Sequence, residues 1–233
     1  MHANSTNHRS RRAGQATFAP RQDRSRATRD RILSALMRLL DGKGFDQVSV
    51  SELTAAAGCS MSSFYARFPT KDALFAALLD QFFDTSSQLV GDALSRFRPA
   101  QTTRQQRTRA LIEFLLRSYR EHRGLLRALI DHDRRHPESG FGSRTRQHKR
   151  EMSLAMFAML LDEDFRKVDA RAIESLRFGL WLVVQAIEQI VLFDSQVAGQ
   201  ARLSEDRLVE ELGAVLAERL PQRRLTKTNR SQG

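Results

Sequence analysis

The chain has 233 residues, of which 41% are hydrophobic, and its formal net charge is +11. This length and composition suit one large domain or two small ones with a buried core. The longest nearly continuous apolar run, residues 178–184, is far shorter than the ~20 residues of a membrane span, so we expect no membrane contact. The N-terminal region is Arg-rich without an apolar signal segment, and the single cysteine, Cys59, cannot form an internal disulfide. Both features favour a cytoplasmic protein.

The positive charge lies at the two ends of the sequence. Residues 80–218 carry equal numbers of acidic and basic side chains, so the surplus is confined to residues 1–79 and 219–233. Positive charge gathered at one end is typical of nucleic-acid binders, although solvated basic tails would give the same pattern.

The predicted elements are helices throughout, because no alternating strand pattern is present. Residues 1–27 contain few apolar side chains and are predicted to be a disordered basic arm. A first helix is expected from Arg29 until Gly42 and Gly44 end it. Further helices are expected at about 50–57, 61–68, 71–96, 103–122, 124–132, 141–162, 168–194 and 204–219. The predicted fold is therefore all-α, with about nine helices.

Local signals define the starts of three of these helices. Ser49 and Glu52 fit a capping box, and Ser60 and Thr70 fit N-caps of the next two helices. The two short helices on either side of Gly58-Cys59 match a helix-turn-helix, whose tight turn often needs a glycine. Cys59 itself is expected to be a small apolar filler rather than a redox switch.

The second of these short helices has the chemistry of a DNA-reading helix. Met61, Phe64 and Phe68 share one face and are expected to pack inward. The opposite face carries small residues that can enter a major groove and meet base edges or a thymine methyl group, namely Ser62, Ser63 and Ala66. The flanking Tyr65 and Arg67 are expected to contact phosphates.

Two further basic features suit DNA. Lys71, in the first turn of a helix, opposes the helix macrodipole, but with the free N–H groups there and Tyr65 it would hold a phosphate; an exposed lysine without a role is the alternative. Upstream, a cluster of arginines is predicted to reach the minor groove or phosphates, with a solubilising tail as the alternative. Its members are Arg24, Arg26 and Arg29, flanked by Arg21 and Arg31.

The segment of residues 29–83 resembles the DNA-binding domain of TetR-type transcriptional regulators. The matching run is ILSALMRLLDGKGFDQVSVSELTAAAGCSMSSFYARFPTKDALFAAL, with matching positions at Gly44-Phe45, Val50, Leu53, Ala57-Gly58, Ser60, Phe64-Tyr65, Phe68, Lys71 and Leu74. Ser49 or Val48 stands where the family often has Thr. Met61 stands where the family is often polar, so it either packs inward, as its helical face suggests, or makes an apolar base contact. The resemblance implies a dimer that binds a palindromic operator and releases it when a small ligand enters the C-terminal domain. The full set of predicted DNA-contacting residues is Ser49, Ser51, Ser60, Met61, Ser62, Ser63, Tyr65, Ala66, Arg67 and Lys71.

The expected organisation is a helix-turn-helix domain at 28–75, a helical effector-binding and dimerisation domain at 76–220 and a basic tail at 221–233. Residues 171–194 are apolar almost all round, so one face of this helix could serve a partner subunit. The alternative is that both faces pack within one subunit. The predicted dimer interface consists of Leu176, Leu180, Val183, Ile187, Leu208, Leu212, Val215 and Leu216.

Candidate effector contacts are apolar or amphipathic residues of the C-terminal domain, with ordinary core residues as the alternative. They are Phe114, Tyr119, Met152, Met156 and Trp181. The run Asp131-His132-Asp133 with His136 could gather metal ligands, but Arg134 and Arg135 oppose a cation. We therefore predict no metal and no other cofactor, with His132 as a pocket group or a hydrogen-bonded core histidine.

The motifs of common enzymes are missing, since the sequence has no phosphate-binding glycine loop, Gly-flanked nucleophilic Ser or HExxH pair. The sequence therefore predicts a homodimeric, ligand-responsive regulator, most consistent with a repressor, whose partners are double-stranded DNA and a small-molecule effector. One alternative is a DNA-binding activator or architectural protein without a small-molecule switch. Another is a helical enzyme or protein-interaction adaptor.

Overall fold

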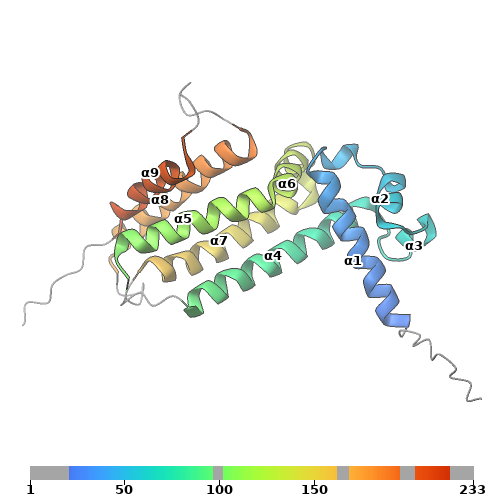
Figure 1. Ribbon diagram of the computed structural model, residues 1–233, viewed down its shortest axis with the longest axis horizontal. Coiled ribbons are helices and arrows are strands. Elements are labelled where there is room, and N and C mark those ends of the chain that lie inside the picture. The colour runs from blue at the N-terminus through green and yellow to red at the C-terminus, as the bar shows by residue number, and fades with distance from the viewer. Residues whose placement is uncertain (1–20, 97–101, 162–167, 195–202, 221–233) are drawn as a thin grey trace, which may run out of the picture.

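The computed structural model describes residues 21–96, 102–161, 168–194 and 203–220, and over these residues the chain forms nine α-helices and no strand. The predicted all-α fold is thus confirmed. The molecule is elongated, with α1, α2 and α3 at one end and α5, α7, α8 and α9 towards the other (Figure 1). Helix α4 runs from the first group into the second, and α6 lies between them.

The N-terminal end contains three α-helices, a 3₁₀ turn and the start of a fourth helix. Their bounds are α1, Arg21–Leu40; η1, Phe45–Gln47; α2, Val50–Ala57; α3, Met61–Tyr65; and α4, Lys71–Arg96. Helix α1 begins within the arm that was predicted to be disordered. The sequence shows no apolar periodicity in these first turns. They are helical because extension of an existing helix costs little free energy and because Arg67 Nε donates to the Ser25 carbonyl at 3.2 Å. Residues 1–20 of the arm and the tail at 221–233 lie outside the described residues.

The predicted helix caps are confirmed. The Ser49 hydroxyl accepts from the Glu52 N–H at 3.2 Å, while the Glu52 carboxylate accepts from the Ser49 N–H at 2.9 Å. Ser60 and Thr70 accept backbone N–H groups in the first turns of α3 and α4. Because these bonds satisfy N–H groups that a helix leaves free, each helix starts at a defined residue.

A first hydrophobic core holds the N-terminal end together and extends into the rest of the chain. Phe45 stacks on Phe75 at a centroid distance of 4.2 Å, and Phe64 is fully buried. Helix α6 contributes Leu125, Ala128 and Leu129 to this core. The predicted domain boundary at residues 75 and 76 therefore falls inside α4, within a core that α6 shares.

The C-terminal end is a helical bundle around a second core. Its helices are α5, Arg104–Glu121; α6, Arg123–Arg135; α7, Phe141–Leu160; α8, Ala170–Ile187; and α9, Glu205–Ala217. A 3₁₀ turn, Pro137–Ser139, precedes α7, and a π-helical turn, Glu188–Leu192, continues α8.

The stripe predicted to form the dimer interface is buried inside the subunit. Seven of its residues belong to the second core, together with apolar residues of α5 and α7, and Val215 packs against that core. The sequence showed that α8 is apolar on most sides, but it assigned to the partner subunit the side of α8 that packs into the core of its own subunit. The side exposed in the subunit carries Phe178 and Trp181, each 55% exposed, with their rings stacked at 5.8 Å.

One helical segment, Ala170–Leu192, is apolar and long enough to cross a membrane by length and composition alone, although no such segment was predicted. Of its most apolar window, 44% is buried inside the subunit. Because the core helix of a bundle passes the same test, the segment is only a weak indication of a membrane span.

The two ends of the molecule meet at α6. A Cβ atom on Gly124, in the first turn of α6, would lie 2.5 Å from the Leu40 carbonyl oxygen at the end of α1. Only a glycine therefore permits this close approach. Further along, Arg135 of α6 pairs with Asp46 of η1, and Arg144 of α7 pairs with Asp80 of α4.

Candidate nucleic-acid interface and effector cavity

The α2–turn–α3 unit is held by a left-handed glycine and by inward-facing aromatic residues. Gly58 ends α2 at φ 61°, a conformation that residues with a side chain rarely adopt, and the Cys59 N–H donates to the Thr54 carbonyl. Phe64 and Phe68 of the α3 segment are buried, as predicted. Cys59 is half-buried and packs against the same core, in keeping with a filler role.

The prediction that Met61 packs inward is wrong. Its side chain is 45% exposed, with its sulfur 3.7 Å from the Thr54 hydroxyl. Met61 is the first residue of α3, immediately after the Ser60 cap. It is therefore available for an apolar contact outside the subunit.

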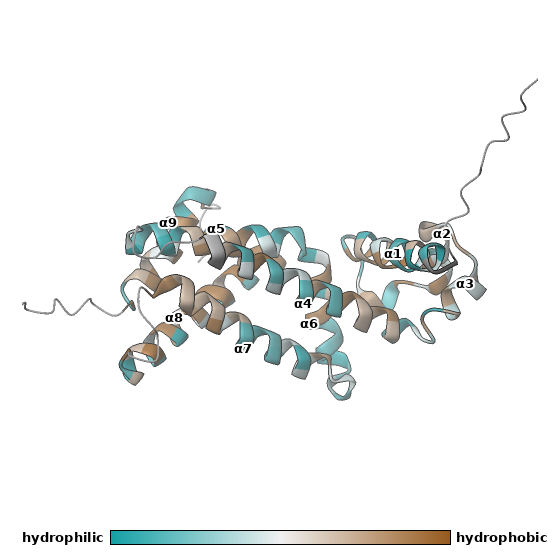
Figure 2. Ribbon diagram, turned by 90° about the horizontal axis from the view of Figure 1, so that it is seen from below, coloured by the Kyte–Doolittle hydropathy of each residue, from teal (hydrophilic) through white to brown (hydrophobic). Residues whose placement is uncertain are grey.

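The predicted reading surface is open to solvent. Tyr65 is 50% exposed, Ser62 and Ala66 are exposed, and Ser63 is half-buried. Helix α3 lies at the outer edge of the molecule in both views (Figures 1 and 2), so no other helix of the described residues covers it. This accessibility is what insertion into a major groove requires.

The serines of this surface share hydrogen bonds. The Ser60 hydroxyl lies 2.9 Å from that of Ser62 and 3.0 Å from that of Ser63. Of the other two predicted serine contacts, Ser51 is exposed on α2, and Ser49 is exposed but its hydroxyl serves the capping box. The linked hydroxyls have spare lone pairs, so they can still accept from a base edge.

Lys71 has an internal role that sequence reasoning missed. Its Nζ donates to the carbonyls of Phe45, Asp46 and Val48 at 3.0, 3.3 and 3.0 Å, and lies 4.6 Å from the centre of the Phe45 ring. An ammonium group has three protons, so these bonds use all of its donors. Lys71 thus fastens the start of α4 to η1, a contact across 23 to 26 residues that no local pattern reveals.

Arginines join α1 to the helix-turn-helix. Arg31 Nε donates to the Ala57 carbonyl at 3.1 Å and Arg38 donates to the Ala56 carbonyl at 3.4 Å, both at the C-terminus of α2, where a cation complements the helix dipole. Arg67, predicted to contact phosphate, donates Nε to the Ser25 carbonyl and Nη1 to the Ser63 carbonyl, which uses two of its five N–H donors. This contact brings the first turns of α1 beside α3. The predicted arm residues Arg24, Arg26 and Arg29 are exposed on these turns.

The bundle contains a cavity of about 410 Å³ whose lining includes every residue predicted to contact an effector. Phe114 and Tyr119 reach it from α5, Met152 and Met156 from α7, and Trp181 from α8. Its size lies within the ~300–1,000 Å³ of small-molecule sites. Sequence reasoning missed the α4 side of the lining, which is Phe82, Phe83, Ser86 and Val90.

A polar network lies at the edge of this cavity. Glu188 is buried at the π-helical turn, where its carboxylate accepts from the Tyr119 hydroxyl at 3.0 Å and from Gln185 Nε2 at 2.8 Å and pairs with Lys149. Burial, reinforced by the Glu188 charge, raises the pKa of Tyr119 well above its usual value, so its hydroxyl remains a donor. π-Helical turns often occur at functional sites.

The charged residues of the lining are basic. Arg146, Lys149 and Arg177 border the cavity, whereas no Asp or Glu of the residues that the structure describes does. Lys149 is paired with Glu188, whereas Arg146 and Arg177 make no ion pair within the described part of the chain. His148 stacks on Phe83 at 4.3 Å, and burial lowers its pKa, so the ring stays neutral near neutral pH.

Comparison with known proteins agrees with this arrangement. The family model "Bacterial regulatory proteins, tetR family" matches residues 32–78. A stretch of 97 residues is 33% identical to the HTH-type transcriptional regulator EthR of Mycolicibacterium smegmatis, covering 42% of this chain and 43% of that protein. A stretch of 82 residues is 37% identical to the HTH-type transcriptional repressor BdcR of Escherichia coli, covering 35% of this chain and 37% of that protein. Each match spans about two fifths of the relative's length.

Solved structures share the fold over most of the chain. A putative TetR-family transcriptional regulator from Mesorhizobium loti superposes with a TM-score of 0.55 at 21% identity, covering 87% of this chain and 97% of that one. A TetR transcriptional regulator from Rhodococcus sp. gives a TM-score of 0.50 at 17% identity, covering 84% and 97%.

The exposed α3, its glycine turn and the basic first turns of α1 define a helix-turn-helix DNA-binding domain. Residues 32–78 of this domain match the model of the tetR family of bacterial regulatory proteins, so this segment is similar to the DNA-binding domain of that family. The named relatives are transcriptional regulators and repressors rather than enzymes, as the sequence led us to expect.

Proposed function

We propose that this chain is a cytoplasmic, ligand-responsive transcriptional repressor that binds a palindromic operator as a homodimer. The observation that carries the proposal is the exposed serine and tyrosine surface of α3 in a domain matched to the tetR family. Repression is inferred because BdcR is named a repressor. The cavity favours a ligand-responsive protein over an activator or architectural protein without a small-molecule switch.

The proposed DNA contacts follow from exposure. Ser62, Ser63 and Ala66 would face base edges, Met61 would make an apolar contact, and Tyr65 would bind a phosphate. The arginines at the start of α1 would add phosphate or minor-groove contacts beside α3. Lys71 would act chiefly by fastening η1 to the start of α4, because all of its donors are engaged within the subunit. Arg67 engages two of its five N–H donors on carbonyls of α1 and α3, so it could hold α3 in position and also bind a phosphate.

For dimerisation we propose the exposed side of α8 together with α9. Phe178 and Trp181 form a stacked apolar pair on that side, and a second copy would remove it from water. A two-fold arrangement would present two α3 helices to half-sites about one helical turn apart or somewhat more.

For the effector we propose an amphipathic anion, with an apolar or aromatic body and an acidic group. The aromatic and methionine lining suits the body, and Arg146 and Arg177 suit the acid. An amine would find no carboxylate among the described residues of this lining, and the nearby Glu188 already accepts from Tyr119 and pairs with Lys149.

Selection of bound duplexes from a random pool tests the DNA proposal. The selected sites should be palindromic. Tyr65→Phe should weaken binding roughly 2–10-fold, the value of one hydrogen bond, whereas Gln88→Ala on the exposed side of α4 should not change it. Equal retention of all three proteins on every duplex, or no selected sequence at all, would contradict the proposal.

Thermal denaturation tests the effector class. Aromatic and medium-chain carboxylic acids should raise the melting temperature more than their uncharged amides do. Double replacement of Arg146 and Arg177 by Gln should abolish the difference between acid and amide. Equal shifts of the melting temperature with acids and amides would contradict an anionic effector. No shift with either would contradict the proposal that the cavity binds a ligand of this class.

A further inference from the structure

The strongest unexplained feature outside the sites described so far is His132 in α6. Its side chain is 3% exposed, and neither ring nitrogen has a hydrogen-bond partner. The ring lies among Phe45, Phe75 and Phe141, with centroid distances of 5.1–5.6 Å. A buried imidazole normally has a partner, so an unsatisfied one calls for a water or an ion. The sequence prediction of a hydrogen-bonded core histidine is therefore wrong.

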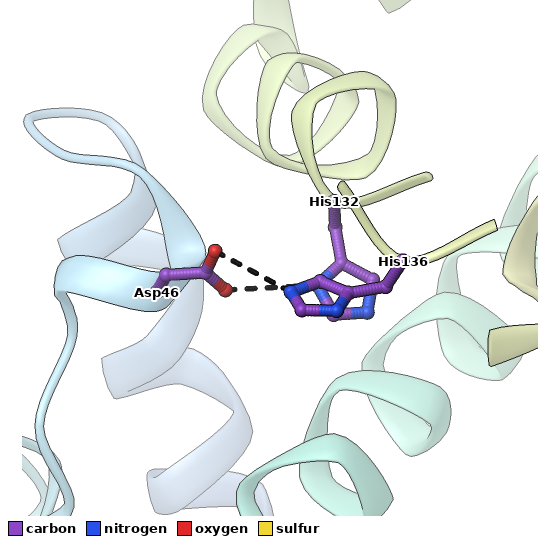
Figure 3. Close-up of side chains that lie close together, drawn as sticks. All are labelled: Asp46, His132 and His136. Carbon is purple, nitrogen blue, oxygen red and sulfur yellow. Dashed lines mark ion pairs between the residues drawn. The ribbon is translucent and has the colours of Figure 1, made fainter. Parts of the chain in front are cut away.

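A carboxylate and a second imidazole lie beside this ring (Figure 3). His132 Nδ1 is 3.7 Å from Asp46 Oδ1, and His136 Nε2 is 3.8 Å from Asp46 Oδ2. One ligand atom from each residue lies within 4.8 Å of the others. In a tetrahedral zinc site, with bonds of about 2.0–2.1 Å, ligand atoms lie roughly 3.4 Å apart, so a small contraction would bring the three into range.

We propose that Asp46, His132 and His136 form a binding site for a divalent transition-metal cation of the Zn²⁺ type. Two imidazoles and one carboxylate are donors that such cations accept. Glu138 lies 3.6 Å from His136 Nδ1, the position from which a carboxylate orients a metal-bound histidine. Asp46 and His136 are partly exposed, which gives the cation a route from solvent and leaves room for a water ligand.

Arg135 is the competitor for this site. Its guanidinium pairs with Asp46 Oδ2, on the carboxylate that the cation would use. The Arg135 side chain is 48% exposed, so it can swing into water when a cation arrives. Arginine and metal would therefore compete for the Asp46 carboxylate.

The site joins the DNA-binding domain to the bundle. Asp46 belongs to η1, whose carbonyls are held by Lys71, and both histidines come from α6 or its C-terminal cap. A bound cation would therefore link η1 to the end of α6 and restrict movement of the helix-turn-helix against the bundle. Metal binding would then change operator affinity from a site outside the effector cavity.

The experiment titrates Co²⁺ and Zn²⁺ into untagged full-length protein, using the visible absorption of Co²⁺ at low coordination number and calorimetry for Zn²⁺. We expect one equivalent per subunit. His136→Gln and Asp46→Asn, which alter partly exposed groups, should each weaken binding at least tenfold with unchanged circular dichroism. His148→Gln, a histidine outside the cluster, should bind as the wild type does, and Arg135→Gln should bind more tightly.

Binding that all these variants retain equally would place the metal elsewhere on the chain and overturn the proposal, as would the absence of binding. An Arg135→Gln variant that binds no more tightly would contradict the shared use of Asp46. Because the readout is metal binding, the proposal stands or falls separately from DNA recognition.

Discussion

Replacement of Lys71 by Met separates two roles of this lysine. The change removes the ammonium group but keeps most of the apolar stem. In the structure, Nζ serves the carbonyls of Phe45, Asp46 and Val48, whereas the sequence resemblance assigned it to a phosphate. The first role predicts a loss of stability, and the second predicts a loss of DNA affinity alone.

The expected destabilisation can be estimated from these contacts. Hydrogen bonds to a charged group contribute about 1.5–3 kcal/mol each when buried. Lys71 is only half-buried, and the Phe45 carbonyl keeps a bond from the Val48 N–H, so about 1 kcal/mol for each bond is more appropriate. Removal of the cation from the first turn of α4 stabilises the protein by roughly 0.3–1 kcal/mol, because a positive charge there opposes the helix dipole. The net loss should therefore be about 2–3 kcal/mol.

Urea unfolding followed by circular dichroism measures this loss. Lys43→Met is the matched control, because it removes a half-buried lysine whose pairing with Glu52 at 2.5 Å should contribute only about 0–1 kcal/mol. Salt titrations of operator binding supply the second readout, since a lost phosphate contact flattens the salt slope by about one unit. Unchanged stability of Lys71→Met with a flatter slope would refute the internal role.

Three further predictions rest on single contacts. Gly124→Ala should destabilise the protein by about 0.5–2 kcal/mol, because overpacking against the end of α1 exceeds the gain in helix propensity. Gly91→Ala, whose added Cβ would have nothing within 4 Å, should instead stabilise it. Urea unfolding compares the two variants. Phe178→Glu should shift sedimentation towards monomer and Leu89→Glu, on α4, should not; equal behaviour would exclude the proposed dimer face. Lys43 and the Ser49 cap lower the pKa of Glu52 to about 2, so the stability that Glu52 contributes is fully present above about pH 4.5 and should be lost as the pH falls towards 2. The free energy of unfolding of Glu52→Gln should lack this pH dependence. A pH profile of stability identical to that of the wild type would contradict the pairing.

Features that depend on nearby residues were predictable from the sequence. The Ser49–Glu52 capping box and the Ser60 and Thr70 caps are local hydrogen bonds within four residues, and each stands where the pattern placed it. The helical class and the helix-turn-helix also follow from periodicity and the turn glycine. The predicted boundaries of α1 and of the short α3 were less accurate, because helix ends also depend on contacts with other elements.

Features that depend on distant residues were not predictable. The apolar character of α8 is clear, but only packing against α5 and α9 shows that Leu176 and Ile187 face the subunit itself. The cluster of Asp46 with His132 joins residues from two domains, so the sequence grouped His132 with Asp131 and Asp133 instead. The five proposed effector contacts do line one cavity, yet the basic residues that define its charge were missed.

The position of α6 explains how a ligand in the cavity would reach the DNA-binding domain. Leu126 and Leu129 of α6 line the cavity, and Leu129 also belongs to the core that holds α1, α2 and α3. At its start α6 touches the end of α1 through Gly124, and near its end it meets η1 through His132 and Arg135. A ligand that fits the cavity only when α6 has moved would displace all three contacts together. It would change operator affinity to the extent that it binds the two positions of α6 unequally.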